Sequence, residues 1–199
     1  MANFGFAFPE PVLRGLCAYL ELLEKWNRVM NLVGVSTWEE MLENLICDSF
    51  HLGNFLSGLH LPAEPEAWDL GAGAGLPGIP LRLVWQKGEY VLVESREKRA
   101  LFLQTAVAAC ALPRTRVVQA RAEDFFPGAG LADLIVSRAF MPWAKMLALV
   151  QDCLKEDGLV VVLALTPPPQ DVPAGWRVAS GQQYRAGGQE RHFWALRRA

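Results

Sequence analysis

Residues 68–80 read Trp68-Asp69-Leu70-Gly71-Ala72-Gly73-Ala74-Gly75-Leu76-Pro77-Gly78-Ile79-Pro80, the pattern of a short strand, a glycine-rich turn and the start of a helix. Glycine has no Cβ and tolerates a positive φ, so four glycines in eight residues allow a tight turn. Pro77 suits the first helical position, and Pro80 still falls in the first turn, where backbone N–H groups have no helical acceptor. We therefore predict a strand–turn–helix unit that offers backbone donors to a small ligand.

Helices are predicted before this unit, and strands alternate with helices after it. The expected helices cover about residues 10–31, 36–56, 77–85, 96–111 and 143–154, and the expected strands 67–70, 90–94, 116–119, 131–137 and 159–165. Such alternation predicts an α/β fold with a mostly parallel sheet covered on both faces. Segments 176–179 and 191–196 are expected to close the sheet as an antiparallel pair. With 199 residues we expect one domain, its helical part over 1–58 and its sheet core over 66–199.

Composition excludes several classes of protein. The formal net charge of −2 gives no global attraction to nucleic acid, so a polyanionic partner would need a local basic patch. The four cysteines form no C-x-x-C pair and the three histidines no ligand-like cluster, so we expect no metal site. No apolar run reaches the length that spans a bilayer. We expect a soluble, cytoplasmic protein with no membrane partner.

Three interpretations compete for the glycine-rich turn. It serves packing alone, it is the G-x-G-x-x-G of a dinucleotide site (Gly73, Gly75, Gly78), or its frame is Asp69-x-Gly71-x-Gly73-x-Gly75. Packing alone does not need four glycines and an acid. Dinucleotide-binding strands usually run apolar up to their first glycine, whereas Asp69 stands four residues before Gly73. The third frame resembles the S-adenosylmethionine loop of Rossmann-like methyltransferases.

The charges of that cofactor match the acids near the turn. Asp69 is expected to accept from the ammonium of its amino acid moiety, while the glycine turn donates N–H groups to its carboxylate. Glu94 ends the second strand, where a carboxylate can accept from ribose hydroxyls. Ala122 and Glu123 follow the third strand, within reach of an adenine amino group. The alternatives are a solvated acid at Glu94 and a capping residue at Glu123.

Further motifs carry a resemblance over nearly the whole chain. They are Trp26-Asn27…Asn31-Leu32, Glu40-Met41-Leu42, Asp48-Ser49, Gly75-Leu76-Pro77-Gly78-Ile79-Pro80, Lys98-Arg99…Phe102-Leu103, Arg121-Ala122-Glu123, Ser137-Arg138-Ala139-Phe140 and Glu190-Arg191-His192. Together they resemble the bacterial guanine-N7 methyltransferases of small-subunit ribosomal RNA, the glucose-inhibited division protein B family. The resemblance implies a class I S-adenosylmethionine-dependent methyltransferase sheet preceded by N-terminal helices. It also implies ribosomal RNA or the 30S subunit as partner of a protein that we expect to be monomeric.

The resemblance also assigns residues. It implies cofactor contacts through Gly71, Leu76, Ala122, Glu123 and Arg138, to which position adds Asp69, Gly73, Gly75 and Glu94. Guanine N7 has a lone pair and no proton to lose, so the reaction needs alignment and no general base. Arg138 is the expected positioning residue. Its structural alternative is a salt bridge to Asp133 or Glu123.

RNA contacts would fall to local basic groups. The candidates are Lys25, Arg28, Arg96, Lys98, Arg99, Arg191 and His192, each of which is otherwise a solvated surface residue. Phe140 or Trp143 stacks on a flipped base or belongs to the core.

The chain also departs from the family pattern. It has Asn44-Leu45 where the family has Arg-His, and Thr166-Pro167 where the family has Lys-Gly. These departures leave open a non-catalytic S-adenosylmethionine-binding sensor or RNA-binding protein. The G-x-G-x-x-G frame leaves open a nicotinamide-dependent reductase.

Overall fold

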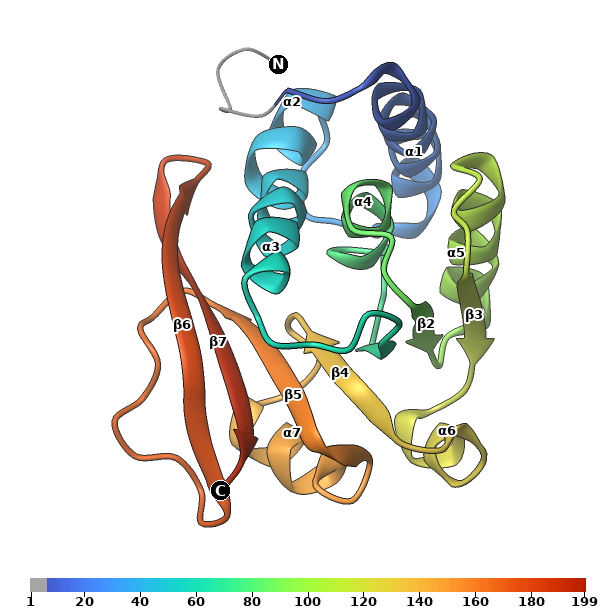
Figure 1. Ribbon diagram of the computed structural model, residues 1–199. Coiled ribbons are helices and arrows are strands. Elements are labelled where there is room, and N and C mark those ends of the chain that lie inside the picture. Colours follow the sequence, from blue (N-terminus) through green and yellow to red (C-terminus); the bar gives the residue numbers. More distant parts are fainter. Residues whose placement is uncertain (1–6) are drawn as a thin grey trace.

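The computed structural model describes residues 7–199 as a seven-stranded sheet between two layers of helices (Figure 1). The strand order is β3-β2-β1-β4-β5-β7-β6. Neighbouring strands from β3 to β5 run parallel, whereas β7 is antiparallel to both β5 and β6. The strands are β1 (Glu66–Leu70), β2 (Glu89–Glu94), β3 (Thr115–Gln119), β4 (Ala132–Ser137), β5 (Leu154–Ala164), β6 (Trp176–Ala186) and β7 (Gln189–Arg198). The predicted α/β fold with a mostly parallel sheet and an antiparallel end is confirmed.

Each face of the sheet carries its own apolar core. One core packs against α1 (Glu10–Met30), α2 (Trp38–Met41), the π-helical turn η2 (Leu42–Ile46), α3 (Cys47–Ser57), α4 (Gly78–Val84) and α5 (Glu97–Ala109). The other packs against α6 (Ala122–Ala129) and α7 (Trp143–Val150), and Figure 1 shows these two helices opposite the larger group. Both faces of the central strands are therefore buried, as a parallel sheet requires.

Strand β1 sets the direction of the residues that precede the glycine turn. Because side chains alternate along a strand, Trp68 and Leu70 enter the core under α6 and α7, whereas Ala67 enters the opposite core. The Trp68 ring lies edge-on to Phe125 with ring centroids 4.9 Å apart. Asp69 consequently points toward the α1, α4 and α5 side.

Some predicted elements differ from those observed. Helix α6 is not among the predicted helices, and Phe125 in its first turn packs against Trp68. Pro77 precedes α4 as its N-cap and does not open it, while Pro80 lies in the first turn as predicted. The last two strands are much longer than expected because each strand supplies the other's hydrogen-bond partners over the whole hairpin.

The second predicted helix starts where expected but is interrupted. The Thr37 side chain accepts from the N–H of Glu40, whose carboxylate accepts in return from the Thr37 N–H, a complete capping box. The π-helical turn η2 then separates α2 from α3. Extra-residue turns of this kind are frequent at functional sites.

The connections after β1 and β4 meet at one edge of the sheet. Here the chain order reverses, because β1 leads outward to β2 and β3 while β4 leads outward to β5. In open α/β sheets this switch point, at the carboxyl ends of the strands, is where ligands bind. Across residues 7–199 no helix combines the length and the apolar character that a bilayer crossing requires.

Candidate functional site

The glycine turn is a rigid structure attached to the end of β2. Gly71, Gly73 and Gly75 have φ of 69°, 58° and 78°, values that residues with a Cβ rarely adopt. The N–H groups of Gly71 and Ala72 donate to the Val93 carbonyl at 2.9 and 3.1 Å. Several of the donors that we expected to face a ligand therefore fix the turn itself.

Glu94 completes this attachment. Its buried carboxylate accepts from the N–H of Gly73 at 2.9 Å and from the N–H of Arg96 at 2.8 Å. The turn after β1 and the turn after β2 thus share one acceptor. Each carboxylate oxygen can accept more than one hydrogen bond. Contact with a ribose hydroxyl therefore stays a prediction compatible with this geometry.

Asp69 is buried beneath the turn. Its Oδ2 accepts from the Tyr90 hydroxyl at 3.4 Å, and a Cβ added to Gly78 would lie only 2.5 Å from the same oxygen. Burial raises the pKa of Asp69 to about 7, while hydrogen bonds from Tyr90 and the Gly78 backbone oppose that rise. Gly78 therefore allows the helix start to approach the carboxyl group. The predicted contact between Asp69 and a ligand ammonium stays a prediction.

A polar cleft of about 550 Å³ opens at the carboxyl ends of β1, β2 and β3. It is lined by Gly71, Val93, Ser95, Arg96, Ala120, Arg121, Ala122, Glu123, Phe140 and Met141. The structure thus brings together Gly71, Ala122 and Glu123, which the resemblance assigns to the cofactor, with Arg96. The volume of the cleft is in the range of small-molecule sites.

Arg138 lies in a second hollow, of about 520 Å³, and not among the residues lining the cleft. Its Nη1 is 3.4 Å from Asp48 and donates to the Leu45 carbonyl at 3.3 Å. The structural alternative, a salt bridge to Asp133 or Glu123, is not what the described residues form, because Arg138 pairs with Asp48 and Asp133 accepts from Lys155 at 2.7 Å. Arg138 therefore connects the turn after β4 to η2 and α3.

Asp48 is the functional candidate that sequence reasoning missed. Its carboxylate is almost fully buried and accepts from Arg191 Nη1 at 2.5 Å and from the Tyr184 hydroxyl at 2.9 Å. Burial, and then the Asp48 charge, raise the pKa of Tyr184, which stays a protonated donor. The available signal was a charged residue in a mostly apolar stretch of a predicted helix. Such a residue must find buried partners.

The basic candidates lie in different surroundings. Lys25 and Lys98 line one shallow hollow between α1 and α5, whereas Arg28 pairs with Glu24 on the surface of α1. Arg99 approaches the glycine turn, with Nη1 3.8 Å from a Cβ placed on Gly73.

The two candidates on β7 are buried. Arg191 is held by Asp48, and His192 Nε2 is 3.3 Å from Glu190. RNA contact by any of the basic candidates stays a prediction.

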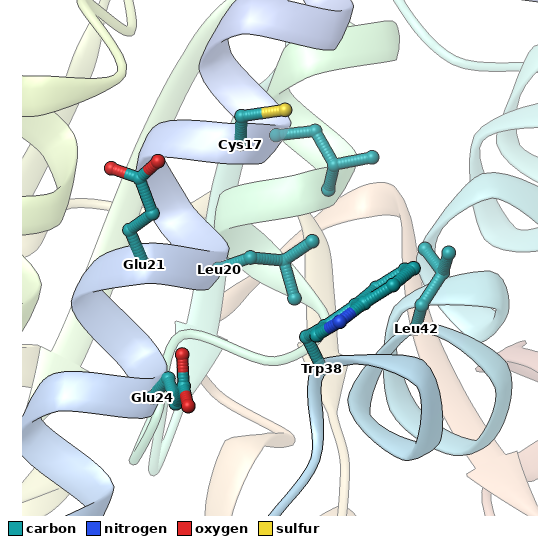
Figure 2. Close-up of a pocket in the computed structure, with 7 residues that line it drawn as sticks. Cys17, Leu20, Glu21, Glu24, Trp38 and Leu42 are labelled. Carbon is teal, nitrogen blue, oxygen red and sulfur yellow. The ribbon is translucent and has the colours of Figure 1, made fainter.

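An apolar groove between α1 and the α2–η2 segment has a different character (Figure 2). Figure 2 shows the Trp38 ring between Leu20 and Leu42, with Glu21 and Glu24 on the α1 side. Two carboxylates make this groove unsuitable for a polyanion. Elsewhere in the described chain, no group of three or more His, Cys, Asp or Glu side chains is placed to hold a metal ion.

Comparison with known proteins identifies the family. The model of the family described as rRNA small subunit methyltransferase G (GidB) matches residues 13–167. Ribosomal RNA small subunit methyltransferase G of Nitratidesulfovibrio vulgaris strain DP4 is 54% identical over 195 residues, covering 97% of this chain and 88% of that protein. The chain belongs to this family. The protein of the same name from Lawsonia intracellularis is 48% identical over 199 residues, covering 99% and 92%.

Solved structures agree on the fold. A mutant of MtNAS in complex with S-adenosylmethionine aligns with a TM-score of 0.65 at 16% identity, covering 93% of this chain and 74% of that one. The putative methyltransferase yhhF from Escherichia coli aligns with a TM-score of 0.58 at 20% identity, covering 76% and 86%. The predicted methyltransferase fold and family are both confirmed, and the chain is a methyltransferase.

The departure at Asn44-Leu45 leaves the second hollow intact. The Asn44 carbonyl accepts from Arg191 Nη1 at 2.8 Å, and the Leu45 carbonyl accepts from Arg138. Backbone carbonyls do not depend on side-chain identity. The ion pairs around Asp48 therefore form even without the two basic side chains that the family pattern has at these positions.

Proposed function

We propose that this protein transfers a methyl group from S-adenosylmethionine to N7 of a guanine in small-subunit ribosomal RNA. The observation that carries the proposal is the polar cleft at the switch point, which Gly71, Ala122 and Glu123 line together. The chain that contains it belongs to this methyltransferase family. The close contact of the Phe140 ring with Gly71 supports the assignment of this cleft to the cofactor. A Cβ on Gly71 would lie 2.4 Å from Phe140 Cδ2, so only glycine leaves this wall in place.

The chain's residues are suited to alignment. The cofactor supplies a methyl group on a positively charged sulfur. Guanine N7 has a lone pair and no proton to lose, so methyl transfer from the bound cofactor would require no general base from the chain. Glu94 fixes the glycine turn that lines the cleft by accepting from the Gly73 N–H. Arg138, in the second hollow, is the residue that positions the substrate. Proximity of this kind can supply much of a barrier reduction.

The exposed cations give the RNA a place to bind. Lys25 and Lys98 face one hollow beside Trp26, and Arg96 lies in the cleft wall. We also propose that the chain acts as a cytoplasmic monomer of one domain, which sedimentation of the purified protein tests. Packing of α1 against α4 and α5 supports the single domain.

Labelled S-adenosylmethionine tests the function directly. Purified protein is incubated with naked small-subunit RNA and with assembled subunits, and the methylated position is mapped by chain scission specific for N7-methylguanine. Label at one guanine is the expected result. Cofactor binding without labelled RNA indicates a sensor or RNA-binding protein, and calorimetric binding of NADH without binding of the methyl donor indicates a reductase. Either outcome overturns the proposal.

A further inference from the structure

The second hollow lies across a short turn from the cofactor cleft. Arg138 and Ala139 line the hollow, and the next two residues, Phe140 and Met141, line the cleft. The turn of residues 138–141 is therefore a wall of both spaces. The other walls of the hollow come from η2, α3, the end of β5 and the β6–β7 hairpin.

Two arginines in this hollow keep unused donors. Each binds acceptors through Nη1 alone, and among residues 7–199 no acceptor engages Nη2 or Nε of Arg138 or Arg191. The Arg191 side chain is only 10% exposed, and its Nε is fully buried without a hydrogen-bond partner. Buried donors without acceptors are rare and call for a ligand or another explanation. The 22% exposure of Arg138 leaves its free nitrogens accessible.

The remaining walls favour a flat aromatic ring over a phosphate group. Leu45, Leu163, Ala164 and Leu165 supply aliphatic surface, and Leu165 is 69% exposed. The uncharged polar side chains of Asn44, Tyr184 and Gln189 complete the walls. The Asp48 carboxylate offsets one of the two guanidinium charges, leaving a net charge of about +1. A phosphate site would be expected to keep its cations uncompensated. Aliphatic walls combined with uncharged hydrogen-bonding groups suit an uncharged organic ligand.

Guanine presents the acceptor that these donors need. On its major-groove edge O6 lies beside N7, whereas adenine presents an amino donor at the corresponding position. If N7 faces the methyl group, O6 remains available to a donor next to the reacting atom. A single arginine contact to O6 would both orient the ring and reject adenine.

We propose that this hollow receives the target guanine, extruded from the RNA, and that Arg138 donates a hydrogen bond to its O6. Asp48 is a positioning residue that holds Arg138 through their ion pair. The assignment rests on the proposed function and adds to it the residue that selects the base. Enzymes that modify bases commonly flip them into such pockets.

The test removes the acceptor and the donor separately. RNA carrying 2-aminopurine at the mapped position keeps N7 but lacks O6. Wild-type protein at saturating cofactor should methylate it with kcat/KM about 10- to 100-fold below that for guanine, the range expected when a hydrogen bond to a charged group is lost. Arg138→Met should lose activity on guanine and prefer guanine over 2-aminopurine less strongly than the wild type does. Arg138→Lys, which keeps a charged donor, should retain part of the preference.

Controls separate the possible failures. Arg14→Met removes an exposed arginine of α1 and should keep the wild-type preference. The inference is overturned if wild-type protein methylates both RNAs equally, or if Arg138→Met keeps the preference. If wild-type protein methylates neither RNA, the proposed function itself has failed.

Asp48 is tested by the same ratio. Asp48→Asn should reduce the preference for guanine while leaving the dissociation constant of the methyl donor unchanged, since Asp48 does not line the cofactor cleft. A lower melting temperature with an unchanged preference would limit Asp48 to a structural role and overturn the positioning assignment.

Discussion

Asp69 and Glu94, on the neighbouring strands β1 and β2, both lie near the glycine turn but have different hydrogen-bond partners. Glu94 accepts from two backbone N–H groups and so joins two turns. Asp69 lies under the turn against Tyr90 and the start of α4. Glu94 therefore fixes the shape of the cleft, whereas burial of Asp69 raises the pKa of its carboxyl group.

Glu94→Gln should weaken binding of the methyl donor by about tenfold, because an amide NH₂ must replace one of two oxygens that each accept from the backbone. Calorimetric titration measures the change. Glu97→Gln, the same substitution at an exposed position in the first turn of α5, is the matched control and should leave affinity unchanged. Equal affinities for both variants would remove Glu94 from the binding site.

Asp69→Asn should change how stability depends on pH. The Asp69 pKa is about 7 in the folded protein, against 3.8 for an ordinary aspartate. Between these values the folded state holds a proton that the unfolded state has lost. The free energy of unfolding therefore falls as pH rises from about 4 to about 7, by at most a few kcal/mol, and then levels off.

Urea unfolding at pH 5 and pH 8 tests this sign. The asparagine variant should lose less stability than the wild type between these two pH values. Asp124→Asn, at an exposed position, should behave like the wild type. A wild-type pH dependence in Asp69→Asn would contradict the raised pKa.

At the scale of elements, the turn after β1 and the turn after β4 are coupled through Phe140, which lies against Gly71. Gly71→Ala would place its Cβ 2.4 Å from the ring, at a φ of 69°. We expect Phe140 to move and binding of the methyl donor to fall by at least tenfold, as measured by calorimetry.

Gly130→Ala is the matched control for this backbone conformation. Gly130 has a φ of 79° with no atom within 4 Å of an added Cβ. Because its ψ is −143°, a combination that essentially only glycine adopts, Gly130→Ala should lose about 1–3 kcal/mol of stability and keep its affinity for the methyl donor. Equal loss of affinity in both variants would show that contact with Phe140 is not the cause.

At the scale of the whole molecule, an acidic protein must bind RNA through a restricted surface. The net charge is −2, yet Lys25 of α1 and Lys98 of α5 face one hollow. Replacing both with Gln should weaken RNA binding and lower the slope of log K against log salt by about 1 to 2, because fewer counterions are released. Binding titrations over a salt series measure it.

Lys87→Gln is the control for the two lysines. Lys87 is exposed next to the amino end of β2, away from the cleft, and its loss should leave the slope unchanged. If the double variant binds RNA with the wild-type salt dependence, the α1–α5 hollow is not part of the RNA surface.

Local patterns predicted most elements but fewer contacts. The glycine turn and the strand at Val91 were readable because turn chemistry and apolar runs are local. Helix α6 was missed because the Pro127-Gly128 pair reads as a loop, while its support by Trp68 comes from a residue more than fifty positions away. The structural alternative for Arg138 was a salt bridge to Asp133 or Glu123, both nearer in sequence than Asp48, the partner it has.

The amino-acid sequence by itself determined the alternation of strands and helices, the glycine turn after β1 and the family, because each depends on residues close together in the chain or on their identity. Only the tertiary structure decided that Asp48 joins Arg138 and Arg191, and that Arg138 lines a hollow separate from the cofactor cleft. Asp48 and Arg191 are 143 positions apart. Burial in a low-dielectric interior forces such charges to pair, but the fold of the intervening chain selects the partner.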